Sequence, residues 1–318
     1  MAAGNPVRER LFKCVGVEFA VPSNVISMIH EKYAHSILPS PDDSVAHLKY
    51  LYWNLPFATT RLNAVICLLD QNLDFMNHRE KKYLYFEDED EYGPKQIFQP
   101  VDWEGHKAPG LTVHFLNAIY YSAVPAEARH HGRSWRQWFE EVAGVYRYPQ
   151  LRNPSHLIIS EEFEYIIEHR SEKLVGLLEH FWSCYEPQIT HGIAITKTLA
   201  ESLVPSGGAT MLLEETFLPL PRLLVELERL CVPKLKFFPF LTLPEELTEA
   251  NQAKWQFLER FGVRSGNSND LYFYVELLNA ISLQHPAAES SVNLEGLFEL
   301  YGLIERHCLS TSERQYVQ

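Results

Sequence analysis

Cysteine is scarce in this chain of 318 residues, and its spacing matches neither a metal site nor a disulfide framework. The five cysteines lie dozens of residues apart, their number is odd, and no two form a Cys-x-x-Cys pair. These features argue against a zinc knuckle and against a disulfide-rich secreted fold. Free cysteines fit a reducing compartment, so we predict a cytoplasmic protein, with the nucleus as the alternative location.

Long apolar runs are also missing. Near the N-terminus, Glu18 interrupts the short apolar run that follows Cys14, so the apolar core of a signal peptide is not present there. The longest run elsewhere, Ala64–Leu69, is far shorter than the roughly 18 residues that a membrane-spanning helix requires. We therefore predict no membrane partner and no encoded anchor.

Positive charge is in short supply as well. The sequence has 28 Lys and Arg against 41 Asp and Glu, which gives a formal net charge of −13. Such a field repels a phosphate backbone unless a local basic stripe overcomes it. The nearest basic cluster, Arg129–Arg133, is short and resembles a loop that leads into a helix. We predict no nucleic-acid partner.

Complete catalytic and cofactor motifs are absent from the sequence. It contains no GxGxxG, P-loop, GxSxG or HExxH motif, and Gly207-Gly208 indicates a hairpin turn. Asp42-Asp43 and Asn269-Asp270 suggest the acidic clusters of a magnesium-dependent terpenoid synthase. Both lack the further carboxylate or hydroxyl groups that hold a diphosphate, so we expect no catalytic residue, no cofactor and no metal.

The chain does contain an internal repeat. An apolar and aromatic segment ends in Gly-Val at three places, Gly16-Val17, Gly144-Val145 and Gly262-Val263, whose glycines are 128 and 118 residues apart. Each pair predicts a helix that stops at the glycine, with the valine packing back on the last turn.

Helices follow each Gly-Val pair, and after the first two pairs the pattern changes from helical to strand periodicity. Apolar side chains recur at helical spacing, most regularly along residues 171–185. Short β-branched and aromatic runs around turn residues then predict a β-ribbon. The predicted strands are 64–69, 73–76 and 83–86 in the first ribbon, and 203–204, 211–213 and 216–218 in the second.

This pattern predicts an α+β fold that is predominantly helical, with tandem modules of helices that each carry a small β-ribbon. We expect module 1 at residues 1–135, module 2 at 136–256 and a partial third module, with helices only, at 257–318. Because arrays of repeats normally end in a capping element, the partial module suggests a piece or a shortened relative of a longer array.

The strongest charge feature is the acidic run Glu87, Asp88, Glu89, Asp90 and Glu91. A row of carboxylates could hold a hard cation, but this run lacks the alternating ligands and the turn glycine of a calcium loop. The better interpretations are a solvated loop or a docking surface for a basic protein partner.

Four features carry a family resemblance: the Gly-Val helices, Val45–Pro56, the strand end Tyr85–Asp88 with Glu91–Gly93, and Glu215–Pro221. Together they are similar to the region downstream of the Hsp90-type ATPase domain in large fungal proteins related to sacsin and to the plant protein NO VEIN. In that family the ATPase domain uses a helical Glu/Asn pair and glycine-rich lid motifs, which this chain lacks. The resemblance implies a scaffold or chaperone-associated role without ATPase chemistry.

Our leading hypothesis from the sequence is a non-enzymatic intracellular protein-interaction or scaffold module. The alternative is an enzyme or small-ligand-binding protein with a pocket between modules, the usual place for such sites. The partner's identity and the oligomeric state do not follow from the sequence.

Overall fold

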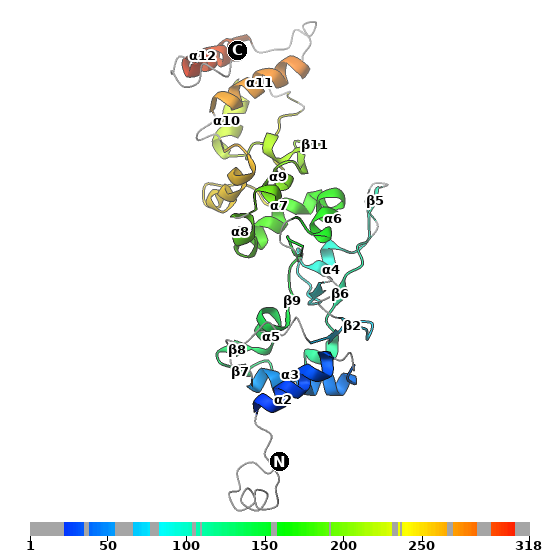
Figure 1. Ribbon diagram of the computed structural model, residues 1–318. Helices are drawn as coiled ribbons and strands as arrows, with labels where there is room; N and C mark the ends of the chain where they lie inside the picture. Colours follow the sequence, from blue (N-terminus) through cyan, green and yellow to red (C-terminus); the bar gives the residue numbers. More distant parts are fainter. Residues whose placement is uncertain are drawn as a thin grey trace, which may run out of the picture. The chain divides into compact units, whose positions relative to one another are not determined.

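The computed structural model describes residues 22–34, 38–54, 66–76, 83–103, 106–108, 110–153, 158–190, 192–230, 235, 237–265, 270–284 and 294–308 (Figure 1). The first predicted Gly-Val pair, Gly16-Val17, lies outside them. The chain divides into two compact units. Unit 1 comprises Met1–Glu89, Gly93–Phe98 and Thr112–Tyr148, and unit 2 comprises Asp90–Tyr92, Gln99–Leu111 and Pro149–Gln318.

Unit 1 begins with two packed helices, α2 (Pro22–Ala34) and α3 (Pro41–Asn54). Helix α3 starts where the sequence predicts, because Pro41 is preorganised for the first turn and the Ser40 hydroxyl accepts a 3.2 Å hydrogen bond from the Asp43 N–H. Apolar side chains from both helices form part of the core of unit 1, which includes Ile29, Tyr33, Leu48, Leu51 and Tyr52.

The β-structure of unit 1 consists of hairpins and one small parallel sheet. Strands β1 (Leu68–Leu69) and β2 (Phe75–Met76) form an antiparallel hairpin. Strand β3 (Leu84–Tyr85) lies between β6 (His114–Phe115) and β9 (Val145–Tyr146) and is parallel to both. The remaining elements of unit 1 are α4 (Pro94–Ile97), η3 (Ala118–Tyr120), β7 (Arg129–His130), β8 (Arg133–Ser134), α5 (Trp135–Trp138) and the π-helical turn η4 (Phe139–Ala143).

Unit 2 is mainly helical. Helix α7 (Ser171–His180) contacts α6 (Glu161–His169), α8 (Trp182–Thr190) and β10 (Leu203–Ser206). Its other elements are β4 (Val101–Trp103), β5 (His106–Ala108), α9 (Ile193–Ala200), β11 (Ala209–Leu212), η5 (Leu213–Glu215), α10 (Pro221–Leu230), η6 (Gln252–Phe261), α11 (Asp270–Gln284) and α12 (Leu294–Cys308). The fold is α+β and predominantly helical, as the sequence predicts.

Both described Gly-Val pairs end a helical segment. Gly144 has φ 71° and Gly262 has φ 86°, which is the left-handed conformation that favours glycine. At the second site the Gly262 N–H donates to the Glu259 carbonyl oxygen at 3.1 Å, and the Val263 N–H donates to the Leu258 carbonyl oxygen at 3.3 Å. This pair of bonds is a Schellman motif, so the predicted helix stop is confirmed there.

The repeat extends to the hydrogen bonds between strands. The Tyr85 carbonyl oxygen accepts from the Leu116 N–H at 2.8 Å, and the Phe217 carbonyl oxygen accepts from the Leu241 N–H at 2.8 Å. Phe217 forms parallel bridges with Phe240 and with Arg264, just as β3 pairs in parallel with β6 and β9. In each unit a central residue, Tyr85 or Phe217, therefore pairs in parallel with one segment on each side.

The same pattern links each hairpin to its sheet. Asp70 forms an antiparallel bridge with Leu116, and Ser206 forms one with Leu241. In both units a residue of the Gly-Val pair or just after it forms one of the two parallel pairings: β9 pairs with β3, and Arg264 pairs with Phe217. Residues up to Tyr146 therefore pair with elements that precede residue 135. The division into three modules at residues 135 and 256 stays a prediction.

Candidate functional site

In the structure, the first three carboxylates of the acidic run, Glu87, Asp88 and Glu89, belong to unit 1 and contact bases there. Both terminal nitrogens of Arg136 donate to the Asp88 carboxylate. Lys95 Nζ lies 2.6 Å from Glu89 Oε1 and 3.1 Å from Glu87 Oε1. The hydrogen bond from Lys95 holds the pKa of Glu89 below its ordinary value.

The last two carboxylates of the run belong to unit 2. His180 Nε2 lies 2.9 Å from Asp90 Oδ2, and Lys173 Nζ lies 2.7 Å from Glu91 Oε1. All five carboxylates thus have a basic partner inside their own unit, which offsets part of the charge that a basic protein would recognise. A docking role for Glu87, Asp88, Glu89, Asp90 and Glu91 stays a prediction.

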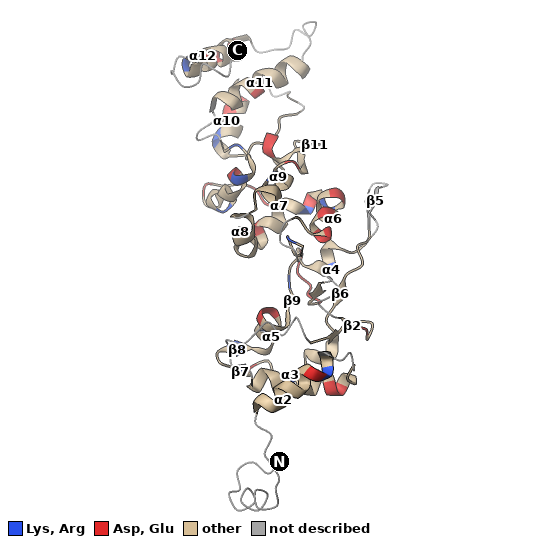
Figure 2. Cartoon of the chain, viewed as in Figure 1, with Lys and Arg blue, Asp and Glu red and all other residues tan. Residues whose placement is uncertain are grey.

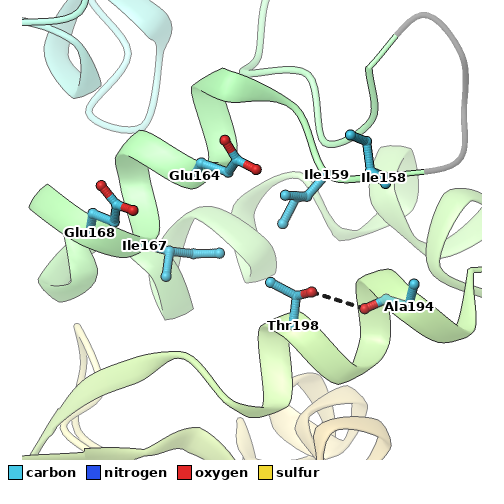
Figure 3. A pocket seen from close by; sticks show the side chains of 7 residues that line it. All are labelled: Ile158, Ile159, Glu164, Ile167, Glu168, Ala194 and Thr198. Atoms are coloured by element: carbon cyan, nitrogen blue, oxygen red, sulfur yellow. Dashed lines mark hydrogen bonds between the residues drawn. The ribbon is translucent and has the colours of Figure 1, made fainter.

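A groove of about 350 Å³ between α6 and α9 is the better candidate for a binding site, and we call it the α6–α9 groove. Its walls come from three parts of unit 2: the segment that precedes α6, α6 itself and α9. Its lining residues are Ile158, Ile159, Glu164, Ile167, Glu168, Ala194 and Thr198 (Figure 3).

Local sequence explains how these elements are placed. Helix α6 begins after Ser160, whose hydroxyl accepts a 3.1 Å hydrogen bond from the Phe163 N–H. Phe163 and Ile166 are fully buried and fix the orientation of α6. Ile167, which the periodicity assigns to the same apolar face, is only partly buried and lines the groove instead.

The floor of the groove is apolar. In Figure 3 the side chain of Ile167 points from α6 toward the side of the groove where α9 carries Ala194 and Thr198. The Thr198 hydroxyl donates to the Ala194 carbonyl oxygen at 3.0 Å, so this hydroxyl hydrogen is already used within α9. Ile158 is 57% exposed, and Ile193, the first residue of α9, is 89% exposed.

The rim of the groove is acidic. Glu164 and Glu168 are four residues apart and therefore lie on the same side of α6, which carries red acidic segments in Figure 2. His169 Nε2 lies 3.8 Å from the Glu168 carboxylate. Among the described residues, no side chain forms an ion pair or a hydrogen bond with the Glu164 carboxylate. An apolar floor beside two carboxylates, of which Glu164 has no such partner in the described part of the chain, suits an apolar segment that carries a basic side chain.

A second hollow of about 590 Å³ lies between α8 and η6, and three of its four charged lining residues already form ion pairs. Lys254 Nζ lies 3.2 Å from Glu179 and 2.6 Å from Glu245. Arg260 contacts Glu186 at 2.7 Å and lies over the Trp182 ring, 5.4 Å from its centroid. These contacts join the helices of unit 2 to one another, so we assign this hollow a structural role.

The basic cluster Arg129–Arg133 forms the β7–β8 hairpin, with His131 and Gly132 at φ 49° and 80° in the turn. Arg133 forms an ion pair with Glu141 at 2.5 Å. Within the described ranges, no three His, Cys, Asp or Glu side chains are placed so that they could hold a metal ion. In the same ranges, no helix has the length and apolar character needed to cross a membrane.

Sequence reasoning singled out the acidic run but not the groove. Ile158, Ile159, Ala194 and Thr198 belong to no motif, and a helix over Ile193–Ala200 was not among the predicted elements. The sequence feature that could have indicated the groove is the pair of isoleucines, Ile158 and Ile193, which lie next to stretches with helical spacing. Comparison with known proteins gave no matching family model, no matching characterised protein and no matching solved structure.

Proposed function

We propose that this chain is a non-enzymatic protein-interaction module, and that the α6–α9 groove binds a partner segment with apolar side chains and at least one Lys or Arg. The observation that carries the proposal is the combination of an apolar floor with Glu164 and Glu168 on one rim. Apolar contact supplies affinity in such grooves, while complementary charge selects the partner and its orientation.

The chemistry of the lining supports binding rather than catalysis. The groove is lined by aliphatic side chains, two carboxylates on one helix and a threonine whose hydroxyl hydrogen is already bonded. Nucleophilic and general-base catalysis would require a nucleophile within hydrogen-bond reach of a base, and the lining residues offer no such pair.

The wider role follows from the resemblance to sacsin- and NO VEIN-related proteins and from the internal repeat. A repeated unit that presents a binding groove fits a scaffold or a chaperone-associated protein. We place this role in the cytoplasm, with the nucleus as the alternative, because the widely spaced cysteines fit a reducing compartment. A basic partner also suits the formal net charge of −13.

A peptide titration tests the groove. The probe is a short, fluorescein-labelled amphipathic peptide with leucine on one face and lysine on the other, and fluorescence anisotropy follows its binding to the full chain. Ala194→Trp places a large ring in the groove and should weaken binding about tenfold or more. Because Ala194 lies at a partly open surface, the variant should keep the far-ultraviolet circular dichroism of the native chain.

The matched control distinguishes binding of the peptide in the groove from its general attraction to an acidic surface. Glu228→Lys reverses an exposed charge on α10, away from the groove lining, and should leave the affinity within about twofold of the native value. Equal affinities for the native chain and for Ala194→Trp would contradict the proposal.

A further inference from the structure

Helices α2 and α3 carry two partly buried histidines, His30 on α2 and His47 on α3. Among the described elements, α3 is the main packing partner of α2 (Figure 1). Ile29 and Tyr33 of α2 are each only 5% exposed and belong to the core of unit 1. The attachment of α2 to unit 1 therefore depends largely on its interface with α3.

The side chain of His30 has a buried nitrogen without a partner. Its Nε2 atom is shielded from solvent and has no hydrogen-bond partner in the described part of the chain. In a neutral ring with the hydrogen on Nδ1, Nε2 is only an unused acceptor, whereas protonation places a donor and a positive charge there. Because an unpaired buried charge is costly, burial lowers the pKa of His30 below its ordinary value of about 6.5.

The side chain of His47 contacts α2 through Tyr33. Its Nδ1 lies 3.4 Å from the Tyr33 hydroxyl oxygen, and the two rings meet edge-on with their centroids 5.8 Å apart. A neutral imidazole can accept the hydroxyl hydrogen at Nδ1, whereas a protonated ring carries a hydrogen on both nitrogens and cannot. The other titratable groups that interact with Tyr33, Cys67 and Tyr120, are uncharged at neutral pH. Protonation of His47 therefore weakens a contact that joins α3 to α2.

The charges around His47 also disfavour its protonation. The charged residues of the two helices are Glu31 and Lys32 on α2 and Asp42, Asp43 and Lys49 on α3. Lys32 Nζ lies 3.9 Å from Asp43 Oδ2, so the carboxylate four residues before His47 already has a cationic partner. Burial lowers the pKa of His47, the charge of Lys32 lowers it further, and Asp43 offsets only part of this effect.

We propose that α2 is an acid-released latch: it stays docked on α3 while His30 and His47 are neutral, and it leaves α3 when both take up protons. Release exposes Ile29 and Tyr33 and opens the part of the core to which they contribute. Protonation of histidines between pH 5 and 8 is a common way to change such an interface. The inference is independent of the α6–α9 groove, which belongs to unit 2.

The sign of the pH effect follows from the lowered pKa values. The released helix binds more protons than the docked helix, so docking is fully stable above the unfolded pKa of about 6.5 and is lost as the pH falls below it. At pH 5.5, each histidine that stays neutral in the docked helix shifts the equilibrium toward release by about tenfold. Carboxylates take up protons near pH 4, so pH 5.5 separates the histidines from them.

Hydrogen–deuterium exchange of the full chain at pH 7.5 and pH 5.5 tests the latch. Exchange is expressed as protection factors, which divide out the intrinsic pH dependence of the amides. Protection of the α2 amides should fall about tenfold or more at pH 5.5, while protection of the α7 amides in unit 2 stays within about threefold. Unchanged protection of α2, or an equal loss in α2 and α7, would overturn the proposal.

Variants assign the effect to the two histidines. The double variant His30→Phe and His47→Gln cannot take up these protons, so its α2 protection should change by less than about twofold between the two pH values. His169→Gln, which removes an exposed histidine from α6, is the matched control and should keep the full loss. A double variant that still loses α2 protection about tenfold would contradict the proposal.

The single variants decide the question if the double variant has lost helical circular dichroism at pH 7.5. Each of His30→Phe and His47→Gln should then show a smaller loss of α2 protection at pH 5.5 than the native chain does, because one of the two protons is no longer taken up. A loss as large as that of the native chain in both single variants would show that these histidines do not hold α2, and the proposal would be wrong.

Discussion

Asp70 and His114 join the β1–β2 hairpin to the parallel sheet of unit 1 through a hydrogen bond of 2.9 Å between Asp70 Oδ2 and His114 Nδ1. The Asp70 side chain is fully buried, and its other oxygen accepts from the N–H groups of Asn72 and Asp74 at 2.8 and 2.9 Å. Burial alone would raise the pKa of Asp70, but these hydrogen bonds, led by the one from His114, lower it below its ordinary value.

Asp70→Asn should destabilise the chain by about 2 kcal/mol at neutral pH, because an uncharged amide accepts these hydrogen bonds more weakly. The lowered pKa means that the native carboxylate stabilises the fold above the unfolded value of about 3.9 and loses this effect as the pH falls through the folded value. The free energies of unfolding of the two proteins, measured in urea from pH 7 down to pH 3, should therefore converge.

Asp74→Asn is the control for Asp70, since Asp74 is exposed in the same hairpin. Its free energy of unfolding should stay within about 0.5 kcal/mol of the native value. A constant difference between the native chain and Asp70→Asn at every pH would show that the charge of Asp70 is not what stabilises the hairpin.

Gly262→Ala should destabilise unit 2 by about 1–2 kcal/mol or more, because Gly262 has φ 86°. In addition, an added Cβ would lie 2.9 Å from the Cβ of Glu214. Gly302→Ala in α12 meets no atom within 4 Å and should instead stabilise the chain by about 0.5–1 kcal/mol. Urea unfolding measures both, and equal effects of the two substitutions would contradict the assigned helix stop.

Trp135 and Trp255, each of which precedes one of the two described Gly-Val pairs, differ in their hydrogen bonds. Trp135 Nε1 donates to the Tyr120 carbonyl oxygen at 2.7 Å, whereas Trp255 Nε1 is buried and has no hydrogen-bond partner within the described part of the chain. Trp135→Phe should therefore cost about 1 kcal/mol more than Trp255→Phe in free energy of unfolding. If Trp255→Phe proves the more destabilising change, packing rather than hydrogen bonding dominates at both sites.

Two neighbours in the acidic run differ in their contribution to stability: Asp88 is a structural residue, whereas Glu89 is solvated. Arg136 binds Asp88 with two nitrogens and lies 4.2 Å from the centre of the Phe86 ring. Asp88→Asn should cost about 1 kcal/mol, and less at high salt, whereas Glu89→Gln should change the stability by under about 0.5 kcal/mol. Thermal unfolding at two salt concentrations checks the difference in stability. A larger loss of stability in Glu89→Gln than in Asp88→Asn would show that Glu89, and not Asp88, is the structural residue.

Local signals in the sequence predict several parts of the fold correctly. The turn at 70–72, the helix stops at Gly144 and Gly262, and the hairpin at Gly207-Gly208 all depend on backbone conformations or caps that particular residue types prefer. The loop of this hairpin is shorter than the predicted strands 203–204 and 211–213 imply, because β10 extends through Ser206, β11 begins at Ala209, and only the two glycines, at φ 54° and 90°, lie between them.

The parallel sheet and the groove could not be predicted in the same way. Strands β3, β6 and β9 have two residues each and pair across many intervening residues, so their periodicity carries no information about partners. The groove combines Ile158, Ile167 and Ala194 from three segments that only tertiary packing brings together. Helical spacing places Ile167 on the apolar face of α6, but it does not show that Ile167 lies at the edge of that face and lines the groove.

The α6–α9 groove is tested most directly by reversing the charges on both sides of the interaction. In the double variant Glu164→Lys and Glu168→Lys, binding of the leucine–lysine peptide should weaken about tenfold or more. Binding of a matched leucine–glutamate peptide, negligible with the native chain, should appear with the double variant at comparable affinity. If the double variant binds the lysine peptide as well as the native chain does, the α6–α9 groove is not the binding site.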